Sequence, residues 1–160
     1  MEHKKLKWCL GLKDGLKMVE PHETLAKSYL KEAKQSLERA EKNFQDGDLL
    51  WTTVVIYYAE YYALYSFLQN SFLQKIGMKC ENHLCSILAV GFLLGEDKTK
   101  IINDHKEKRI DAQYYMKFGK EEQVDKMLQE AKIFVSIFDE LVSNITENEI
   151  SDYREKLKQA

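Results

Sequence analysis

The stretch from Leu49 to Leu73 constrains the fold more than any other part of the chain, because it carries a single charged residue, Glu60. Its apolar side chains recur at helical spacing on two opposite faces. The first face is formed by Trp51, Val54, Val55, Tyr58, Tyr62, Tyr65, Leu68 and Phe72, and the second by Ile56, Tyr57, Leu64 and Phe67. A helix that is apolar on both faces must be covered on both. We therefore expect other helices or an identical subunit to enclose it.

A membrane span is the alternative interpretation of this stretch, since about 20 apolar residues are enough to cross a bilayer. Its middle, however, holds Glu60 among tyrosines, which are Tyr57, Tyr58, Tyr61, Tyr62 and Tyr65. Tyrosine prefers the membrane interface, and a carboxylate at the bilayer centre is costly. The stretch is thus predicted to be the buried helix of a bundle, in a protein that does not associate with membranes.

The remaining composition predicts an all-α fold. A chain of 160 residues with 44% hydrophobic and 31% charged residues fits one domain with one core. It contains one proline and seven glycines, and no pair of alternating apolar and polar runs joined by a turn. We predict an up-and-down antiparallel bundle of four to five main helices. The net charge of -2 provides no global attraction to nucleic acid, so any RNA contact must be local.

The chain divides into three parts. Residues 1–20 are predicted to be a loosely held basic arm in which Trp8 and Leu12 dock, residues 21–145 the bundle, and residues 146–160 a short C-terminal helix or tail. The first bundle helix opens at Pro21 and ends at the Asp46-Gly47-Asp48 turn. Gly47 suits a left-handed cap and Asp48 suits the N-cap of the central helix. Further helices are expected at about 81–94, about 98–118 and through 124–142.

The cysteines are Cys9, Cys80 and Cys85, an odd and widely split set, which is typical of unpaired thiols in a reducing cytoplasm. Together with His83 and His105 they offer enough ligands for zinc, but the spacing is poor, because zinc sites usually use closely paired ligands. We expect a packed Cys80–Cys85 pair and a capping His83. Neither a glycine-rich phosphate loop nor a nucleophile motif occurs, so no metal and no cofactor are predicted.

The candidate site lies in the fourth helix, which has the most polar buried stripe of the chain. His105 and Arg109 are four residues apart and share a helix face, and Asp111, Tyr114 and Tyr115 follow within two turns. An arginine beside a histidine or tyrosine can hold a phosphate and position a hydroxyl group. The alternative is a structural arginine, buried against a nearby aspartate or a tyrosine hydroxyl, and spacing alone favours it.

Several short motifs resemble the HEPN superfamily, the higher eukaryote and prokaryote nucleotide-binding domain. They are Trp51 at the start of the central helix, Tyr61-Tyr62-Ala63, Gly77 with His83 six residues later, and the run from Arg109 to Tyr114. The resemblance covers about residues 22–142 and is nearest to the branch of stand-alone small proteins paired with minimal nucleotidyltransferases. It implies a helical bundle, a homodimer, and a role in RNA cleavage, nucleotide binding or toxin-antitoxin pairing.

The chain departs from the ribonuclease members of that superfamily in one respect. Their arginine is followed, after four to six residues, by a histidine, whereas Arg109 is followed by Tyr114, Tyr115 and Met116, and His105 precedes it. The departure removes the expected catalytic imidazole. In related toxins a tyrosine near the end of this motif receives AMP from the partner nucleotidyltransferase, so the resemblance makes Tyr114 and Tyr115 candidate AMP acceptors.

Three hypotheses follow. The first is a cytoplasmic homodimer, weakly catalytic or non-catalytic, that binds a nucleotide or RNA phosphate at Arg109 and pairs with a minimal nucleotidyltransferase. The second is a divergent metal-independent ribonuclease that uses Arg109 with His105 or Tyr114. The third is an interaction scaffold in which Arg109 is only structural.

Overall fold

The computed structural model describes residues 2–12, 16–18, 23–71, 73–75 and 83–160. Within these ranges the helices are α1 (Glu2–Gly11), α2 (Glu23–Gln45), α3 (Leu49–Ser71), α4 (His83–Leu94), α5 (Lys100–Tyr115), α6 (Glu121–Asn144) and α7 (Glu147–Lys158). A 3₁₀ turn, η1 (Glu96–Lys98), joins α4 to α5, and two short strands are β1 (Leu16–Met18) and β2 (Leu73–Lys75). Pro21, Gly77 and Cys80, to which the sequence analysis assigned roles, lie outside the described residues.

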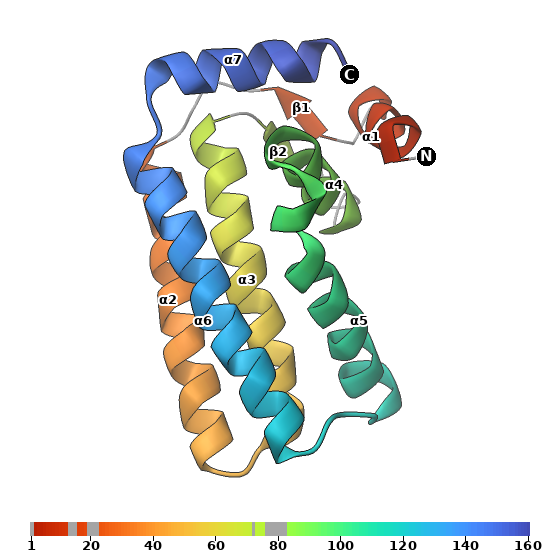
Figure 1. The fold of residues 1–160 in the computed structure, drawn as a ribbon, viewed down its shortest axis with the longest axis vertical. Coiled ribbons are helices and arrows are strands. Elements are labelled where there is room, and N and C mark those ends of the chain that lie inside the picture. Colours follow the sequence, from red (N-terminus) through yellow and green to blue (C-terminus); the bar gives the residue numbers. More distant parts are fainter. Residues whose placement is uncertain (1, 13–15, 19–22, 72, 76–82) are drawn as a thin grey trace.

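The long helices α2, α3 and α6 run side by side, α5 packs along α3, and α7 crosses one end of the bundle near α1 (Figure 1). The all-α antiparallel bundle predicted from composition is therefore confirmed. The α2–α3 turn also follows the sequence prediction. Gly47 adopts a left-handed backbone with φ 79°, and the Asp48 Oδ1 accepts a hydrogen bond from the Trp51 backbone N at 3.1 Å.

Helix α3 is enclosed by the rest of the bundle, as its two apolar faces require. Tyr57 and Leu64 are fully buried, and α2, α4, α5 and α6 all contact α3. Trp51 is the exception to the predicted buried face: it lies in the first turn of α3, beside the exposed hairpin turn, and is 50% exposed. No helix in the described parts of the chain combines the length and apolarity needed to span a bilayer.

The N-terminal residues differ from the loose arm that the sequence predicts. Residues 2–11 form α1, which packs on α4 through Leu6 and Cys9, whereas Trp8 points to solvent. After α1, strand β1 pairs antiparallel with β2 at the end of α3, with Leu16 opposite Lys75. The alternation rule missed these strands because each has three residues, too few to show a period of two.

The cysteine prediction is also wrong. Cys9 and Cys85 form a disulfide that joins α1 to α4 across 76 residues of sequence, and both side chains are buried. Cys85 is therefore bonded to Cys9 rather than packed as a free thiol. Because stable disulfides are typical of oxidising compartments, the cytoplasmic location deduced from free thiols loses that support.

Helix α7 follows a short break after α6. The Thr146 hydroxyl oxygen caps its first turn by accepting a hydrogen bond from the Glu149 backbone N at 3.2 Å. Leu157 is buried and anchors the helix on the bundle end. The C-terminal segment is thus helical, one of the two outcomes the sequence left open.

Candidate functional site

Arg109 lies in the third turn of α5 and turns its side chain onto the aromatic face of α3. Its guanidinium carbon is 5.0 Å from the ring centroid of Tyr57, 5.7 Å from that of Tyr58 and 6.0 Å from that of Tyr114. Nη1 donates a hydrogen bond to the Gln113 Oε1 at 3.1 Å. With 9% of the residue exposed, the charge rests mainly against ring faces, which attract cations through their quadrupole.

The Arg109 guanidinium has no carboxylate partner among the described residues, and its Nε has no hydrogen-bond partner there. The two aspartates that could pair with a purely structural Arg109 are Asp104 and Asp111, and neither forms an ion pair with it. Asp104 pairs with the Lys108 Nζ at 2.9 Å, which lowers the Asp104 pKa, and Asp111 is exposed. A buried charge without a counterion is costly, and the ring contacts and the Gln113 hydrogen bond offset part of that cost.

An aromatic cluster adjoins Arg109 where α3 meets the start of α4. The Tyr57 hydroxyl and the His83 Nδ1 are 2.7 Å apart, and the His83 ring stacks on Tyr61 with centroids 3.9 Å apart. The Tyr61 hydroxyl lies 3.3 Å from the Ser86 Oγ. Burial raises the pKa of both Tyr57 and Tyr61, so their hydroxyls remain protonated and act as neutral hydrogen-bonding groups.

His83 is the residue of this cluster that sequence reasoning did not place in the candidate site. It entered as part of the family resemblance, as a helix cap and as one of the zinc ligands considered and set aside. Tyr57 and Tyr61 are four residues apart and share a face of α3, but no local pattern shows that His83 from another helix meets it.

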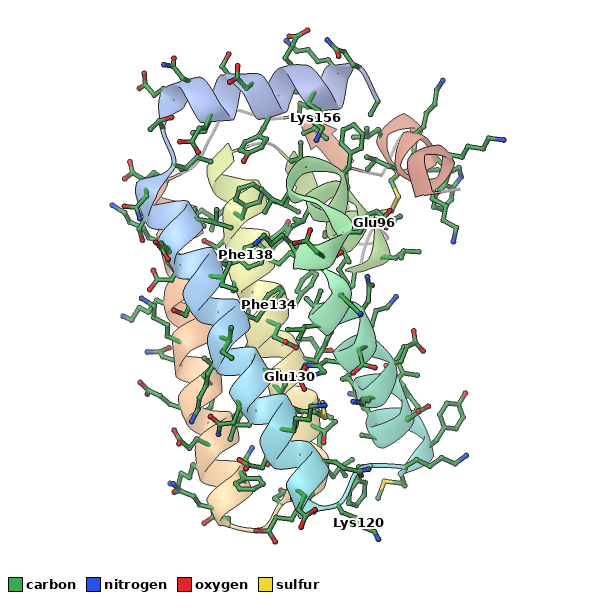
Figure 2. All side chains as sticks on the ribbon, viewed as in Figure 1. Glu96, Lys120, Glu130, Phe134, Phe138 and Lys156 are labelled. Atoms are coloured by element: carbon green, nitrogen blue, oxygen red, sulfur yellow. A yellow bond between two sulfur atoms is a disulfide. The ribbon has the colours of Figure 1, made fainter. Side chains whose placement is uncertain are left out.

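His105 lies in the core, on the seam between α3, α5 and α6. Its Nδ1 is 2.8 Å from the Glu60 Oε1, and neither side chain has exposed surface. Its Nε2 is 3.9 Å from the Glu130 Oε2 on α6 and has no hydrogen-bond partner among the described residues. Figure 2 shows Glu130 on α6, midway along the bundle. Burial raises the Glu60 pKa to about 7, although His105 opposes the shift.

The other predicted site residues lie near the C-terminal end of α5. Tyr114 and Tyr115 are each 66% exposed, and α5 ends at Met116, whose φ of 55° is left-handed. The structure thus brings Tyr114 to Arg109 and leaves the Tyr115 ring in solvent. Asp111 lies on the flank of α5 that faces away from Arg109. In the described residues, no three His, Cys, Asp or Glu side chains are arranged to hold a metal ion.

The architecture defines an all-α antiparallel bundle with a buried polar seam between α3 and α5. Comparison with known protein families matches the HEPN domain over residues 26–141, which is well over half of the chain. The chain therefore belongs to the HEPN domain family. No curated protein and no solved structure matches it in the corresponding comparisons.

Proposed function

We propose that this HEPN protein binds the phosphate of a nucleotide or of RNA at Arg109. The observation that supports the proposal is the guanidinium itself, which is buried on aromatic rings and paired with no carboxylate in the described residues. A phosphate would accept hydrogen bonds from the Nη atoms, as arginine forks do with oxyanions. It would also supply the missing negative charge.

The surroundings of Arg109 indicate how such a ligand would sit. Of the rings around the guanidinium, Tyr58 is half-buried and Tyr114 is exposed, so a ligand that reaches Arg109 would approach past these two rings. A base attached to the bound phosphate could stack on Tyr114, as bases of single-stranded nucleic acid do on aromatic side chains. The site therefore suits a flexible single-stranded end or a free nucleotide better than a regular duplex.

Binding is favoured over cleavage as the role of this site. The ribonuclease hypothesis drawn from the sequence uses His105 or Tyr114 as the proton-transfer group beside Arg109, and His105 is fully buried against Glu60. Tyr114 lies beside Arg109 and is exposed, but its hydroxyl has no hydrogen bond to a base among the described residues. We keep divergent ribonuclease activity as the second function to be tested.

The partner proposals concern the end of α5. A minimal nucleotidyltransferase could reach Tyr114 and Tyr115, because both phenols are exposed. In such a reaction the phenol oxygen would attack the α-phosphate of ATP, the phenol proton would pass to solvent, and pyrophosphate would leave. The exposed apolar groups nearby, Met116 and Phe118, also suit a protein contact, either this partner or the second copy of a homodimer.

The test is binding of AMP, ATP and short single-stranded RNA to the wild type, Arg109→Ala and Arg109→Lys. Loss of a charge-assisted contact worth about 1.5–3 kcal/mol predicts affinity about 10- to 100-fold weaker in Arg109→Ala. Arg109→Lys keeps the charge but loses the paired hydrogen-bond donors of the guanidinium, so its affinity should lie between those of wild type and Arg109→Ala. Arg39→Ala on α2, which removes an exposed arginine, is the matched control.

Circular dichroism must first show that each variant is folded. Equal affinity of Arg109→Ala and wild type for all of these ligands would refute the site. RNA cleavage that persists in a nuclease-free preparation and is lost in Arg109→Ala would favour the ribonuclease instead.

A further inference from the structure

Helix α1 lies at the edge of the molecule, where the Cys9–Cys85 disulfide joins it to α4 (Figures 1 and 2). Its main contacts are with α4 and with strand β1, which follows it in the chain. Among its described side chains, Leu6 and Cys9 are buried, Leu10 is half-buried and the others are exposed. A small apolar contact and one covalent bond therefore hold α1 on the bundle.

Helix α1 is too short to be stable by itself. It has 10 residues, and isolated helices shorter than about 12–15 residues are marginal in water. Its helical state therefore depends on its attachment to α4. The disulfide secures that attachment, because it keeps Cys9 beside Cys85 although 76 positions separate them in the sequence.

The other end of the bond lies in the first turn of α4, which also reaches the aromatic cluster. His83 is two positions before Cys85, and its Nδ1 is 2.7 Å from the Tyr57 hydroxyl. Ser86 follows Cys85, and its Oγ is 3.3 Å from the Tyr61 hydroxyl. The bond therefore fixes the turn from which both of these side chains reach α3.

Tyr57 connects this turn to Arg109. Its hydroxyl meets His83, and its ring centroid lies 5.0 Å from the Arg109 guanidinium carbon. A displacement of His83 would release the hydroxyl and remove one of the contacts that orient the ring. The disulfide is thus linked to Arg109 through two successive side-chain contacts.

Reduction of the bond requires α1 to move, because Cys9 is 1% exposed and Cys85 has no exposed surface. A thiolate can reach the sulfurs only when α1 separates from α4. Leu6 resists this separation, but with Leu88 and Phe92 of α4 it lines a cavity of about 240 Å³. Side chains beside a cavity lose part of their packing contacts, so the opening of α1 costs less than the opening of a filled interface.

We propose that the Cys9–Cys85 bond is a redox latch, a site of thiol–disulfide exchange with a dithiol, whose reduction frees α1 and loosens the contact of His83 with Tyr57. One thiolate of the dithiol attacks a sulfur of the bond, the S–S bond breaks, and the other cysteine leaves as a thiolate that takes a proton. The second thiol of the reductant then attacks the mixed disulfide and releases the second cysteine as a thiol. The protein gains two electrons and two protons, and the dithiol becomes a disulfide.

The redox latch has a consequence for ligand binding at Arg109, because Tyr57 forms part of the surface on which the guanidinium rests. The reduced form is expected to hold this ring less firmly and to bind the ligand of Arg109 more weakly. This consequence rests on the function proposed for Arg109, whereas the release of α1 does not.

The first experiment is hydrogen exchange followed by mass spectrometry. Cys80→Ser leaves Cys9 and Cys85 as the only cysteines and is the background for every variant. Exchange is read at amides 6–11 of α1 and 87–90 of α4, which bond to carbonyls one turn earlier. Dithiothreitol, a dithiol, is expected to raise exchange there by roughly tenfold or more, whereas α2 and α6 stay protected. Cys9→Ser should give the reduced pattern without reductant.

A matched pair of variants tests whether α1 must open before reduction. Leu6→Ala removes the buried anchor of α1, and Lys5→Ala shortens an exposed side chain of the same helix. With maleimide labelling of the freed thiols as the readout, Leu6→Ala should be reduced roughly tenfold or more faster than the background protein. Lys5→Ala should be reduced at the background rate.

The redox latch is overturned if protein purified without reductant already labels at both cysteines. It is overturned equally if exchange in α1 and at amides 87–90 is the same before and after reduction. Equal reduction rates for Leu6→Ala and Lys5→Ala would also contradict it, because reduction would then not depend on the opening of α1.

Binding of AMP and short single-stranded RNA to the two redox forms tests the link to Arg109. The reduced form is expected to bind roughly fivefold or more weakly, at the lower end of coupling between sites. Equal affinities of the two forms, with binding still lost in Arg109→Ala, would overturn this link. Absence of binding in both forms would instead refute the function proposed for Arg109, and the exchange data would still decide the redox latch.

Discussion

Replacing Glu60 by glutamine should change how the stability of the protein depends on pH. Glu60 is fully buried, with His105 bonded to it and with Glu130 and Asp104 raising its pKa further. The glutamine Oε1 can still accept the hydrogen bond from the His105 Nδ1 but carries no charge at any pH. The variant therefore keeps the contact and removes the ionisation.

The size of the effect follows from the Glu60 pKa, which rises from 4.5 to about 7 on folding. Below pH 4.5 Glu60 is protonated in both the folded and the unfolded state, so its burial carries no penalty for a buried charge. As the pH rises from there through the folded pKa, the unfolded chain ionises first and the folded state loses stability. At 1.36 kcal/mol per pKa unit, the full loss is roughly 3 kcal/mol, complete just above the folded pKa.

Urea denaturation of wild type and Glu60→Gln, followed by circular dichroism at pH 5, 6, 7 and 8, measures this difference. The unfolding free energy of the variant relative to wild type should increase by about 2–3 kcal/mol from pH 5 to 8. The other titrating groups are shared, so the contributions of those that do not contact Glu60 cancel in the comparison. Parallel pH profiles for the two proteins would refute the argument that Glu60 is held in its neutral form by burial.

Two further predictions concern the core and the disulfide. Phe138→Ala removes a buried ring that packs on Phe134 and should lower the unfolding free energy by about 3–5 kcal/mol in urea titrations. The exposed Ile133→Ala on the same helix should change it by no more than about 0.5 kcal/mol. Similar losses in the two variants would contradict the burial of Phe138 in the core. Cys9→Ser opens a crosslink across 76 residues and should lower the unfolding free energy by up to about 4.5 kcal/mol through loop entropy, measured against wild type without reductant. An unchanged urea midpoint would show that the bond does not form.

Local patterns accounted for much of the bundle. The apolar stretch around Glu60 predicted the central helix, and the Asp46-Gly47-Asp48 turn predicted the hairpin with its cap, because both depend on residues within a few positions of each other. The same reasoning failed for Trp51, since its helical position was apolar but the bundle ends beside it. Periodicity shows which face is apolar, not how far the neighbouring helices extend.

The candidate site was predictable in part. Arg109 and Tyr114 were recognised from their spacing in one helix, and the structure brings them within contact of each other. His105 lies four residues before Arg109 on the same face of α5, but its partner is Glu60, 45 residues earlier in the chain. Nothing in the sequence near His105 indicates that pairing, because it depends on the packing of α5 against α3.

The sequence by itself determined the helices of the bundle, the hairpin and the presence of an arginine on a mostly buried face. Tertiary structure alone decided that Arg109 has no acidic partner in the described part of the chain, that His83 meets Tyr57, and that Cys9 reaches Cys85. The physical reason is that helix formation depends on neighbours along the chain, whereas the partner of a buried charge or thiol is set by which helices pack together.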